Sequence, residues 1–472
     1  MGSRIRVGRR LAVATGAVAL LCATAAQPAM SAAPVSFTRI AGVTSPGTPS
    51  KYNKVGILKV GAKKAKNVLV LNPGTSASAA YFVPLAQDIV AKRPGWQVWS
   101  VERRENMLED HSRLDQAKAK KISPKAAFDY YLGYITDQSI QPHFQNIPDA
   151  SVAYAKQWGM NTEIGDLRRV VLEAEKLKGK VVVGGHSLGG SITTAYATWN
   201  FGGKAGATGL DGLVFIDGGS GPMPSFTEQV ATERLAEFNK PTTSPWLTFG
   251  GFPAPLAGLF NSTGSLGVLL DPDSPSIGQA FPALPANLKP SIPVTNAGLY
   301  GYALDSKTSP PSLIAAQAHL GALAASGDPR GWDDSKALTP LKRFATMFSG
   351  FGLKSLDGTA WYHPQRLTLD AGAVAAGNAN PAQKVLNVQA TKGKNLPKSL
   401  RIYAFGASLG GQRVLDAASA LGKQSKIPNG QLTLVNRAST YAHNDPNSAS
   451  PKNDFVKFLL PYLTKVEKDP AS

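Results

Sequence analysis

A serine flanked by glycines is the first feature of this sequence that could do chemistry. The motif GHSLG, residues 185–189, follows three valines and precedes the helix-like segment LGGSITTAYATWN. A strand that turns sharply into a helix lifts the serine hydroxyl above the edge of a sheet, and the glycines let strand and helix approach closely. A chance G-x-S-x-G would not need a strand before it and a helix after it. The pattern therefore predicts that Ser187 is a nucleophile, at a helix N-terminus that favours developing negative charge.

With its flanking strand and helix, this motif resembles the nucleophile elbow of the α/β-hydrolases, in particular of secreted bacterial lipases and esterases. The resemblance covers roughly residues 50–220 and 398–470. It implies an α/β fold, with a mostly parallel sheet and helices on both faces. It also implies a Ser-His-Asp triad and an acyl-enzyme on Ser187. The elbow is the specific part of the resemblance, and the other motifs are looser.

The resemblance places the catalytic base after the last strand. His443 lies there, in the segment STYAHNDP between the strand QLTLVNR and the final helix. Among the other five histidines, His186 lies inside the elbow and is expected to point away from the nucleophile, and the rest precede the last strands. His443 is therefore the predicted base, with an ordinary surface-loop histidine as the alternative. Asp445 is expected to cap this loop and to take no part in catalysis.

The acid departs from the common family pattern. It usually follows the strand RIYAFGAS, but the segment GASLGGQ there contains no Asp or Glu. Asp217 ends the earlier strand GLVFIDGG, at the same sheet edge as Ser187, and some lipases carry the acid at that strand. Asp217 is the preferred acid, Asp416 in a predicted helix is the second candidate, and a structural cap is the alternative role for Asp217.

An oxyanion hole needs two donors. The resemblance implies that the backbone N–H of Leu188, directly after the serine, is one of them. The second is Thr75 in the segment LNPGTSAS, which looks like the P-G-T loop of some lipases, where threonine donates both N–H and hydroxyl. A simple turn closed by Asn72 and Pro73 is the alternative for this segment.

Strands and helices alternate in two parts of the chain, as expected for a parallel sheet covered on both faces. VGILKVG and NVLVLNPG are expected to pair as a hairpin, and TEIGDLRRVVLEAEKLKGK to form a helix that ends at Gly179. Between the two parts, prolines, glycines and short apolar patches replace the alternation. We expect a core in segments 34–220 and 396–472, and a mainly helical cap or lid at 221–395. The segment WYHP, residues 361–364, is expected to be aromatic core rather than pocket lining.

Residues 1–33 have the pattern of a secretory signal peptide. Four arginines precede the apolar run LAVATGAVALLCATAA, and small residues follow it. The protein is therefore expected to be secreted and extracellular, with cleavage near residue 33. Cys22, the only cysteine, lies in this segment. A cysteine nucleophile and a thiolate metal site are thereby excluded from the mature chain.

The net charge of +19 is spread along the chain and lacks the basic–aromatic alternation of nucleic-acid binders. A solvated basic surface is the simplest interpretation, and adhesion to an anionic cell wall is a further possibility. Nothing in the sequence indicates a metal or an organic cofactor. The predicted function is a secreted serine hydrolase that cleaves carboxylic esters, lipid-like or polyester-like. A peptidase of the same fold and an acyltransferase with the same triad are the alternatives.

Overall fold

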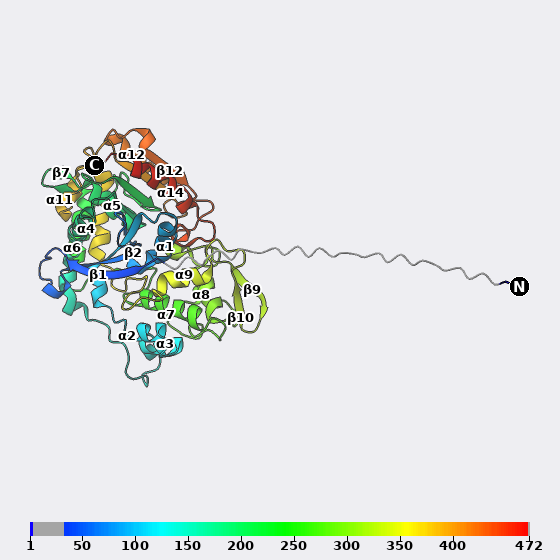
Figure 1. Cartoon of the computed structure of the whole chain (residues 1–472). Helices are drawn as coiled ribbons and strands as arrows, with labels where there is room; N and C mark the ends of the chain where they lie inside the picture. Colours follow the sequence, from blue (N-terminus) through cyan, green and yellow to red (C-terminus); the bar gives the residue numbers. More distant parts are fainter. Residues whose placement is uncertain (3–32, 471–472) are drawn as a thin grey trace. The chain divides into compact units, whose positions relative to one another are not determined.

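An eight-stranded sheet forms the centre of the computed structural model, which describes residues 1–2 and 33–470. Residues 33–472 make up one unit, shown with its strands as arrows in Figure 1. The predicted signal segment lies almost entirely outside the described residues. The strands of the sheet are β1 (Val35–Ala41), β2 (Lys54–Val60), β3 (Asn67–Asn72), β4 (Trp96–Glu102), β5 (Val181–His186), β8 (Gly212–Ile216), β11 (Arg401–Gly406) and β12 (Leu432–Asn436).

The strands lie in the order β1-β2-β4-β3-β5-β8-β11-β12, and all pairs from β4 to β12 are parallel. This order and the turn after β5 define an α/β-hydrolase fold, so the predicted fold class is confirmed. The expected hairpin between the segments of β2 and β3 is wrong. Strand β4 lies between them, pairing antiparallel with β2 and parallel with β3. The partner of β2 on its other side is β1.

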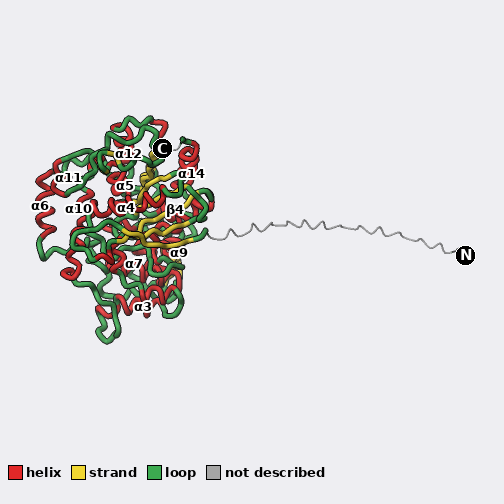
Figure 2. Tube along the Cα trace, turned by 60° about the vertical axis from the view of Figure 1, so that its left-hand side comes forward, coloured by secondary structure: helices red, strands yellow, loops and turns green. Residues whose placement is uncertain are grey.

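Successive side chains of each strand point to opposite faces of the sheet, and different helices cover the two faces. On β5, Val181 and Val183 belong to one apolar cluster and Val182 to the other, as the period of a strand requires. The tube in Figure 2 shows the strands surrounded by helices. The helices beside the first face are α4 (Met160–Glu175), α5 (Leu188–Thr198), α10 (Gln365–Ala371), α11 (Pro381–Leu386) and α12 (Gln412–Gln424). Those beside the second are α1 (Val83–Lys92), α9 (Leu341–Ser349) and α14 (Asp454–Lys468).

A third apolar cluster, called the cap from here on, draws on two separate parts of the chain. It joins residues 108–158, after β4, to residues 246–362. Trp361 and Tyr362 are buried in it, so their assignment to aromatic core is confirmed. Figure 1 shows α2 and α3 below α7 and α8. The elements of these two parts, besides α9, are α2 (Ser112–Lys118), α3 (Pro124–Tyr131), α7 (Leu256–Leu270), α8 (Asn296–Leu304) and the two strands β9 (Ala322–Gly327) and β10 (Arg330–Asp333).

This packing divides the chain differently from the expected segments. The region 108–158, expected in the core, contributes to the cap, whereas α10, α11 and the residues up to Leu396 pack against the sheet cluster. Helix α6 (Glu228–Asn239) packs beside α10 and α11. Helix α4 ends at Glu175, four residues before the expected end, because Lys178 takes up a positive φ of 55°. None of the described helices is long and apolar enough to cross a membrane.

Candidate active site

Ser187 lies on the turn between β5 and α5, with a backbone conformation (φ 58°, ψ −124°) that residues with side chains rarely adopt. Its N–H donates to the carbonyl oxygen of Ile216 on neighbouring strand β8 at 3.0 Å. The flanking glycines are required by space. A Cβ at Gly185 would lie 2.2 Å from the carbonyl oxygen of Gly189, and one at Gly189 would lie 2.0 Å from that of Asn72. Close packing of strand and helix therefore holds the strained turn in place.

A small cavity of about 50 Å³ connects the predicted catalytic residues. Ser187, His443 and Thr75 all line it. A much larger open cavity, of about 1030 Å³, has none of these three residues in its lining, so size alone does not identify the reactive site. The small cavity is the candidate active site because its lining contains both the serine at the elbow and the histidine after the last strand.

His443 and Asp217 form a buried pair. His443 follows β12, Asp217 follows β8, and His443 Nδ1 lies 2.6 Å from Asp217 Oδ2. An ionised carboxylate can only accept a hydrogen bond, so His443 Nδ1 is the donor and the neutral ring keeps its lone pair on Nε2. Nε2 is the atom that a general base needs. The side chains are 1% and 0% exposed, which keeps water from competing for this hydrogen bond.

Asp217 is held by the segment that follows β11, which contains no Asp or Glu. Asp217 Oδ1 accepts hydrogen bonds from the backbone N–H groups of Ala407, Gly410 and Gly411 at 2.6, 2.9 and 3.1 Å. Burial opposes ionisation of Asp217. The hydrogen bond and charge of His443, followed by the N–H of Ala407, outweigh burial and lower the pKa of Asp217. The segment GASLGG therefore supplies donors for an acid that comes from another strand.

His186 and Tyr81 contact the loop that carries His443. His186 Nε2 lies 2.9 Å from the carbonyl oxygen of His443, and the centroids of the two rings are 4.3 Å apart. The Tyr81 hydroxyl donates to Asn444 Oδ1 at 2.5 Å. Burial, and then the nearby His443, lower the pKa of His186 to about 3, so His186 stays neutral. Sequence reasoning gave these two side chains no role, because their contacts join residues far apart in the chain.

Thr75 and Leu188, the predicted oxyanion donors, lie on the two segments on either side of Ser187. Leu188 is the first residue of α5, directly after Ser187, and Thr75 lines the same cavity after β3. Among the described residues, neither backbone N–H donates to a protein acceptor, which leaves both available to a substrate oxygen. A Cβ at Gly74 would lie 2.9 Å from Ser187 Cβ, so the loop of Thr75 packs directly against the serine.

Arg103, at the end of β4, anchors this loop and was not identified from the sequence. Its guanidinium donates to the carbonyl oxygens of Pro73, Gly74 and Ala77 at 3.0, 3.0 and 2.9 Å. Arg103 is 2% exposed and also donates to Glu105 Oε1 at 2.8 Å. These hydrogen bonds fix the carbonyl oxygens of the loop on the side facing Arg103. The loop can then present its backbone N–H groups on the opposite side. Arg103 is therefore a positioning residue for the predicted oxyanion hole.

An apolar cavity of about 130 Å³ lies in the cap next to the candidate site. It shares four lining residues with the smaller cavity, among them Phe249 and Ala316. Among the described residues, no charged side chain lines it. Its apolar lining comes largely from α7, α8 and the segments beside them: Phe128, Phe249, Phe252, Phe260, Leu284, Leu288, Leu299 and Leu313. An apolar group attached to a carbonyl near Ser187 could extend into this space.

The remaining sequence candidates lie in other settings. Asp416 is exposed on α12 and accepts a hydrogen bond from Gln412 Nε2 at 2.9 Å. Asp445 Oδ2 accepts from the Ala442 N–H at 2.7 Å and lies 2.5 Å from His319 Nδ1, so it fixes the His443 loop from the side of the cap. The structure thus brings His443 together with Asp217 and not with Asp416.

Comparisons with known proteins returned neither a matching family model nor a matching curated protein. Solved structures do match. One is a putative lipase from Sulfolobus solfataricus, 15% identical, with a TM-score of 0.47 over 91% of this chain and 93% of that chain. Another is a thermostable carboxyl esterase from Bacillus coagulans, 12% identical, with a TM-score of 0.41 over 92% and 99%. A haloalkane dehalogenase from Bradyrhizobium elkani is 10% identical, with a TM-score of 0.39 over 92% and 99%. Such distant likenesses do not identify the reaction.

Proposed function

We propose that this protein is a serine hydrolase that cleaves carboxylic esters with an apolar acyl group. One observation carries the proposal: Ser187, on a strained strand–helix turn, shares a cavity with His443, whose Nδ1 lies 2.6 Å from Asp217 Oδ2. A serine, a correctly polarised imidazole and a buried carboxylate are the parts that acyl transfer needs.

In the proposed mechanism, His443 Nε2 takes the proton of Ser187 as the serine oxygen attacks the ester carbonyl. Asp217 stabilises the imidazolium ion, and the N–H groups of Thr75 and Leu188 bind the oxyanion. His443 then returns the proton to the leaving alcohol, and an acyl-enzyme remains on Ser187. A water molecule activated by the same histidine releases the acid and restores the enzyme.

The lining of the two cavities supports an ester over a peptide substrate. Among the described residues, neither cavity has an Asp or Glu side chain in its lining that could bind the free amine of a peptide. Each buried methylene group contributes about 0.8 kcal/mol, so an apolar acyl chain gains affinity from the adjoining space. Lipid-like and polyester-like substrates both present such chains next to an ester carbonyl.

A substrate screen separates the candidate activities. p-Nitrophenyl esters with acyl chains of about 2 to 16 carbons should be hydrolysed, with kcat/KM rising with chain length until the cavity is filled. Aminoacyl anilides should not be hydrolysed. Faster turnover of the anilides would favour the peptidase. Transfer of the acyl group to an added sugar or alcohol, with little free acid, would favour the acyltransferase.

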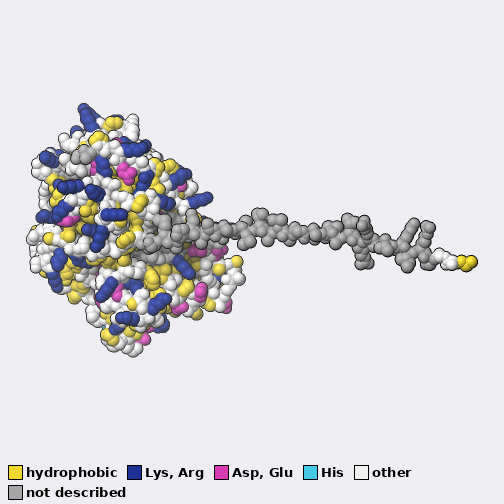
Figure 3. Space-filling model, in the orientation of Figure 1, with side chains coloured by type: hydrophobic (Ala, Val, Ile, Leu, Met, Phe, Trp, Pro, Cys, Tyr) yellow, Lys and Arg dark blue, Asp and Glu magenta, His cyan; other side chains and the backbone are white. Residues whose placement is uncertain are grey.

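We further propose that the mature protein is extracellular and begins near residue 34. The basic and apolar segment at the N-terminus supports this, although it lies outside the described residues. Without its four arginines the chain keeps a charge of about +15, and Figure 3 shows lysines and arginines scattered over the face drawn there. Such a surface suits adhesion to an anionic cell wall. N-terminal sequencing of the protein from culture supernatant tests secretion, and an intact Met1 in the cytoplasm would contradict it.

A further inference from the structure

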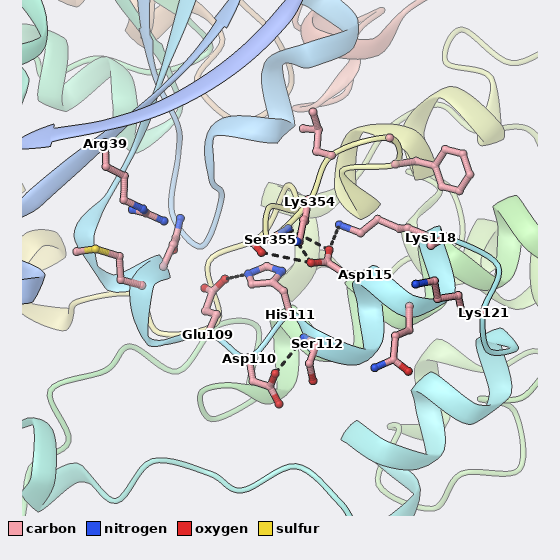
Figure 4. A pocket seen from close by; sticks show the side chains of 17 residues that line it. Arg39, Glu109, Asp110, His111, Ser112, Asp115, Lys118, Lys121, Lys354 and Ser355 are labelled. Carbon is pink, nitrogen blue, oxygen red and sulfur yellow. Dashed lines mark hydrogen bonds and ion pairs between the residues drawn. The ribbon is translucent and has the colours of Figure 1, made fainter.

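The large open cavity and the apolar cavity use their polar side chains differently. In the open cavity, charged groups of both signs pair with one another, and Figure 4 shows Glu109 against His111 and Lys118 against Asp115. In the apolar cavity of about 130 Å³, none of the described lining residues is charged. A polar group without a partner in such a lining bears directly on what the cavity accepts. The polar residues of this lining are Asn261, Thr263, Ser276, Asn296 and Tyr300.

Most of these polar groups are already used within the protein. The Thr263 hydroxyl donates at 2.7 Å to a backbone carbonyl oxygen one turn earlier in α7. Asn296 uses both ends of its side-chain amide on backbone groups, at 2.8 and 3.0 Å. The Ser276 hydroxyl has no partner, but it is buried from water and so is closed to a ligand. Tyr300 and Asn261 remain.

Tyr300 uses one end of the Asn261 amide and leaves the other end free. The Tyr300 hydroxyl donates to Asn261 Oδ1 at 2.6 Å. Tyr300 is 6% exposed, and burial raises the pKa of its hydroxyl, which therefore keeps its proton and needs this acceptor. Among the described residues, Asn261 Nδ2 donates to no protein acceptor. The needs of Tyr300 thus explain the oxygen of Asn261 but not its two N–H groups.

Asn261 lies where the apolar cavity meets the active site. Asn261 and Ala257, one turn apart on the same face of α7, line both cavities. The cavity that Asn261 shares with Ser187 measures about 50 Å³, which is room for only a few water molecules. An acyl chain that extends from Ser187 into the apolar cavity therefore passes the Asn261 amide within its first few atoms.

This position makes the Asn261 amide unfavourable for an ordinary fatty acyl chain. An all-carbon chain displaces water from Nδ2 and leaves both N–H groups without an acceptor, whereas an oxygen atom in the chain accepts from one of them. Resting on the proposed hydrolase function, we propose that Asn261 selects acyl groups with an oxygen acceptor within the first few atoms beyond the ester carbonyl. Hydroxyacyl groups and the successive ester units of a polyester share this chemistry.

The test compares p-nitrophenyl octanoate with analogues in which an ether oxygen replaces the methylene at position 3, 4 or 5. The measured quantity is the ratio of kcat/KM for the best analogue to kcat/KM for octanoate. Asn261→Leu should lower this ratio by about 3- to 10-fold. Comparing ratios between proteins cancels the different chemical reactivities of the esters. Thr263→Val is the matched control on the same helix and should keep the wild-type ratio, because its hydroxyl is bonded to the backbone.

Two further esters distinguish the sources of the oxygen. They carry a hydroxyl or an acetoxy group at the position where the ether is preferred. A larger effect of Asn261→Leu on the hydroxy ester identifies hydroxyacyl substrates, and a larger effect on the acetoxy ester identifies polyesters. Asn261→Leu leaves the Tyr300 hydroxyl without its acceptor. If this variant fails to fold, the double variant Asn261→Leu/Tyr300→Phe removes both partners and replaces it.

A binding measurement separates this inference from the proposed reaction. Ser187→Ala cannot form an acyl-enzyme, and by calorimetry it should bind the methyl ester of the preferred oxygenated acid more tightly than methyl octanoate. The same ratio in wild type and folded Asn261→Leu, with hydrolysis dependent on Ser187, would overturn the inference alone. Absence of hydrolysis would overturn the proposed function. The inference then stands if Ser187→Ala prefers the oxygenated ester and fails if the two esters bind equally.

Discussion

At the scale of single residues, the buried Asp217 carboxylate serves two purposes. It holds His443 in the tautomer that a base needs, and it accepts backbone hydrogen bonds from the segment Ala407–Gly411. The sequence could predict the first role, because Asp217 follows an apolar strand at the edge where Ser187 lies. It could not predict the second, because backbone N–H groups have no signature in the residue types.

Asp217→Asn should therefore lower both activity and stability. An acid that orients the catalytic histidine is worth about 10⁴-fold in kcat. The side-chain amide of the variant also places an N–H group near backbone N–H groups that donate to the carboxylate in wild type. This mismatch should lower the free energy of unfolding by about 1–3 kcal/mol. Ester hydrolysis and urea unfolding measure the two effects. Asp416→Asn is the matched control and should change neither kcat nor the free energy of unfolding. A loss of turnover in this control alone would identify Asp416, on α12, as the catalytic acid.

Arg103 offers a second test at this scale. Lysine keeps the positive charge of Arg103 but has a single ammonium group in place of the planar guanidinium, so it cannot donate to all three carbonyl oxygens. Arg103→Lys should therefore make the loop of Thr75 more mobile. Misplacing an oxyanion donor should lower kcat by about 10²-fold, with KM little changed.

The matched control is Arg104→Lys. Arg104 is equally buried and ion-paired, but with Asp166 on α4. Arg104→Lys should reduce stability while leaving kcat near the wild-type value. Equal losses of kcat in the two variants would mean that Arg103 acts only through stability.

At the scale of elements, sequence reasoning succeeded where the pattern was local. The segment from β5 to α5 was predicted because three valines, a glycine-flanked serine and a helix follow one another directly. The pairing of β2 with β3 was wrong because β4, which lies later in the chain, inserts between them. The end of α4 was also misplaced, since Lys178, not Gly179, turns the chain with a positive φ.

Helix α4 carries a buried acid that should make stability depend on pH. Glu163 is 7% exposed, its Oε1 has no partner, and burial raises its pKa to about 8, against the opposing charge of Arg103. A group whose pKa is raised on folding stabilises the protein fully below its unfolded value of 4.5, and this stability is lost as the pH rises through about 8.

Glu163→Gln cannot ionise and should therefore remain stable where wild type weakens. Urea unfolding at a series of pH values, from below 4.5 to above 8, measures the difference. The free energy of unfolding of the variant should exceed that of wild type by at least about 1 kcal/mol above pH 8. Parallel stability curves for the two proteins would show that Glu163 ionises normally in the folded state.

The helices of the cap make a prediction about substrate length. Ala303 on α8 lines the apolar cavity but not the smaller cavity around Ser187. Ala303→Phe should fill part of the cavity and shift the preferred ester toward shorter acyl chains, by up to about fourfold in kcat/KM per methylene group lost. Ala325→Phe, an exposed position on β9, is the control and should keep the wild-type profile. An unchanged profile for Ala303→Phe would place the acyl chain outside this cavity.

At the scale of the whole molecule, the core is easier to predict than the cap. Core strands are continuous apolar runs between helices, a pattern visible in the sequence. The cap has short elements joined by proline- and glycine-rich segments, and its cluster draws residues such as Phe128 and Leu259 from parts of the chain far apart. The contribution of residues 108–158 to it therefore emerged only from the structure.

The central claim is that Ser187 is the nucleophile of a hydrolase, and covalent labelling tests it most directly. A fluorophosphonate probe should react with the folded protein at one site, and mass spectrometry of the proteolytic peptides should find the label on Ser187. Ser187→Ala should show neither label nor ester hydrolysis, whereas Ser191→Ala, one turn further along the same helix, should keep both. A label on another residue, or full activity in Ser187→Ala, would contradict the claim.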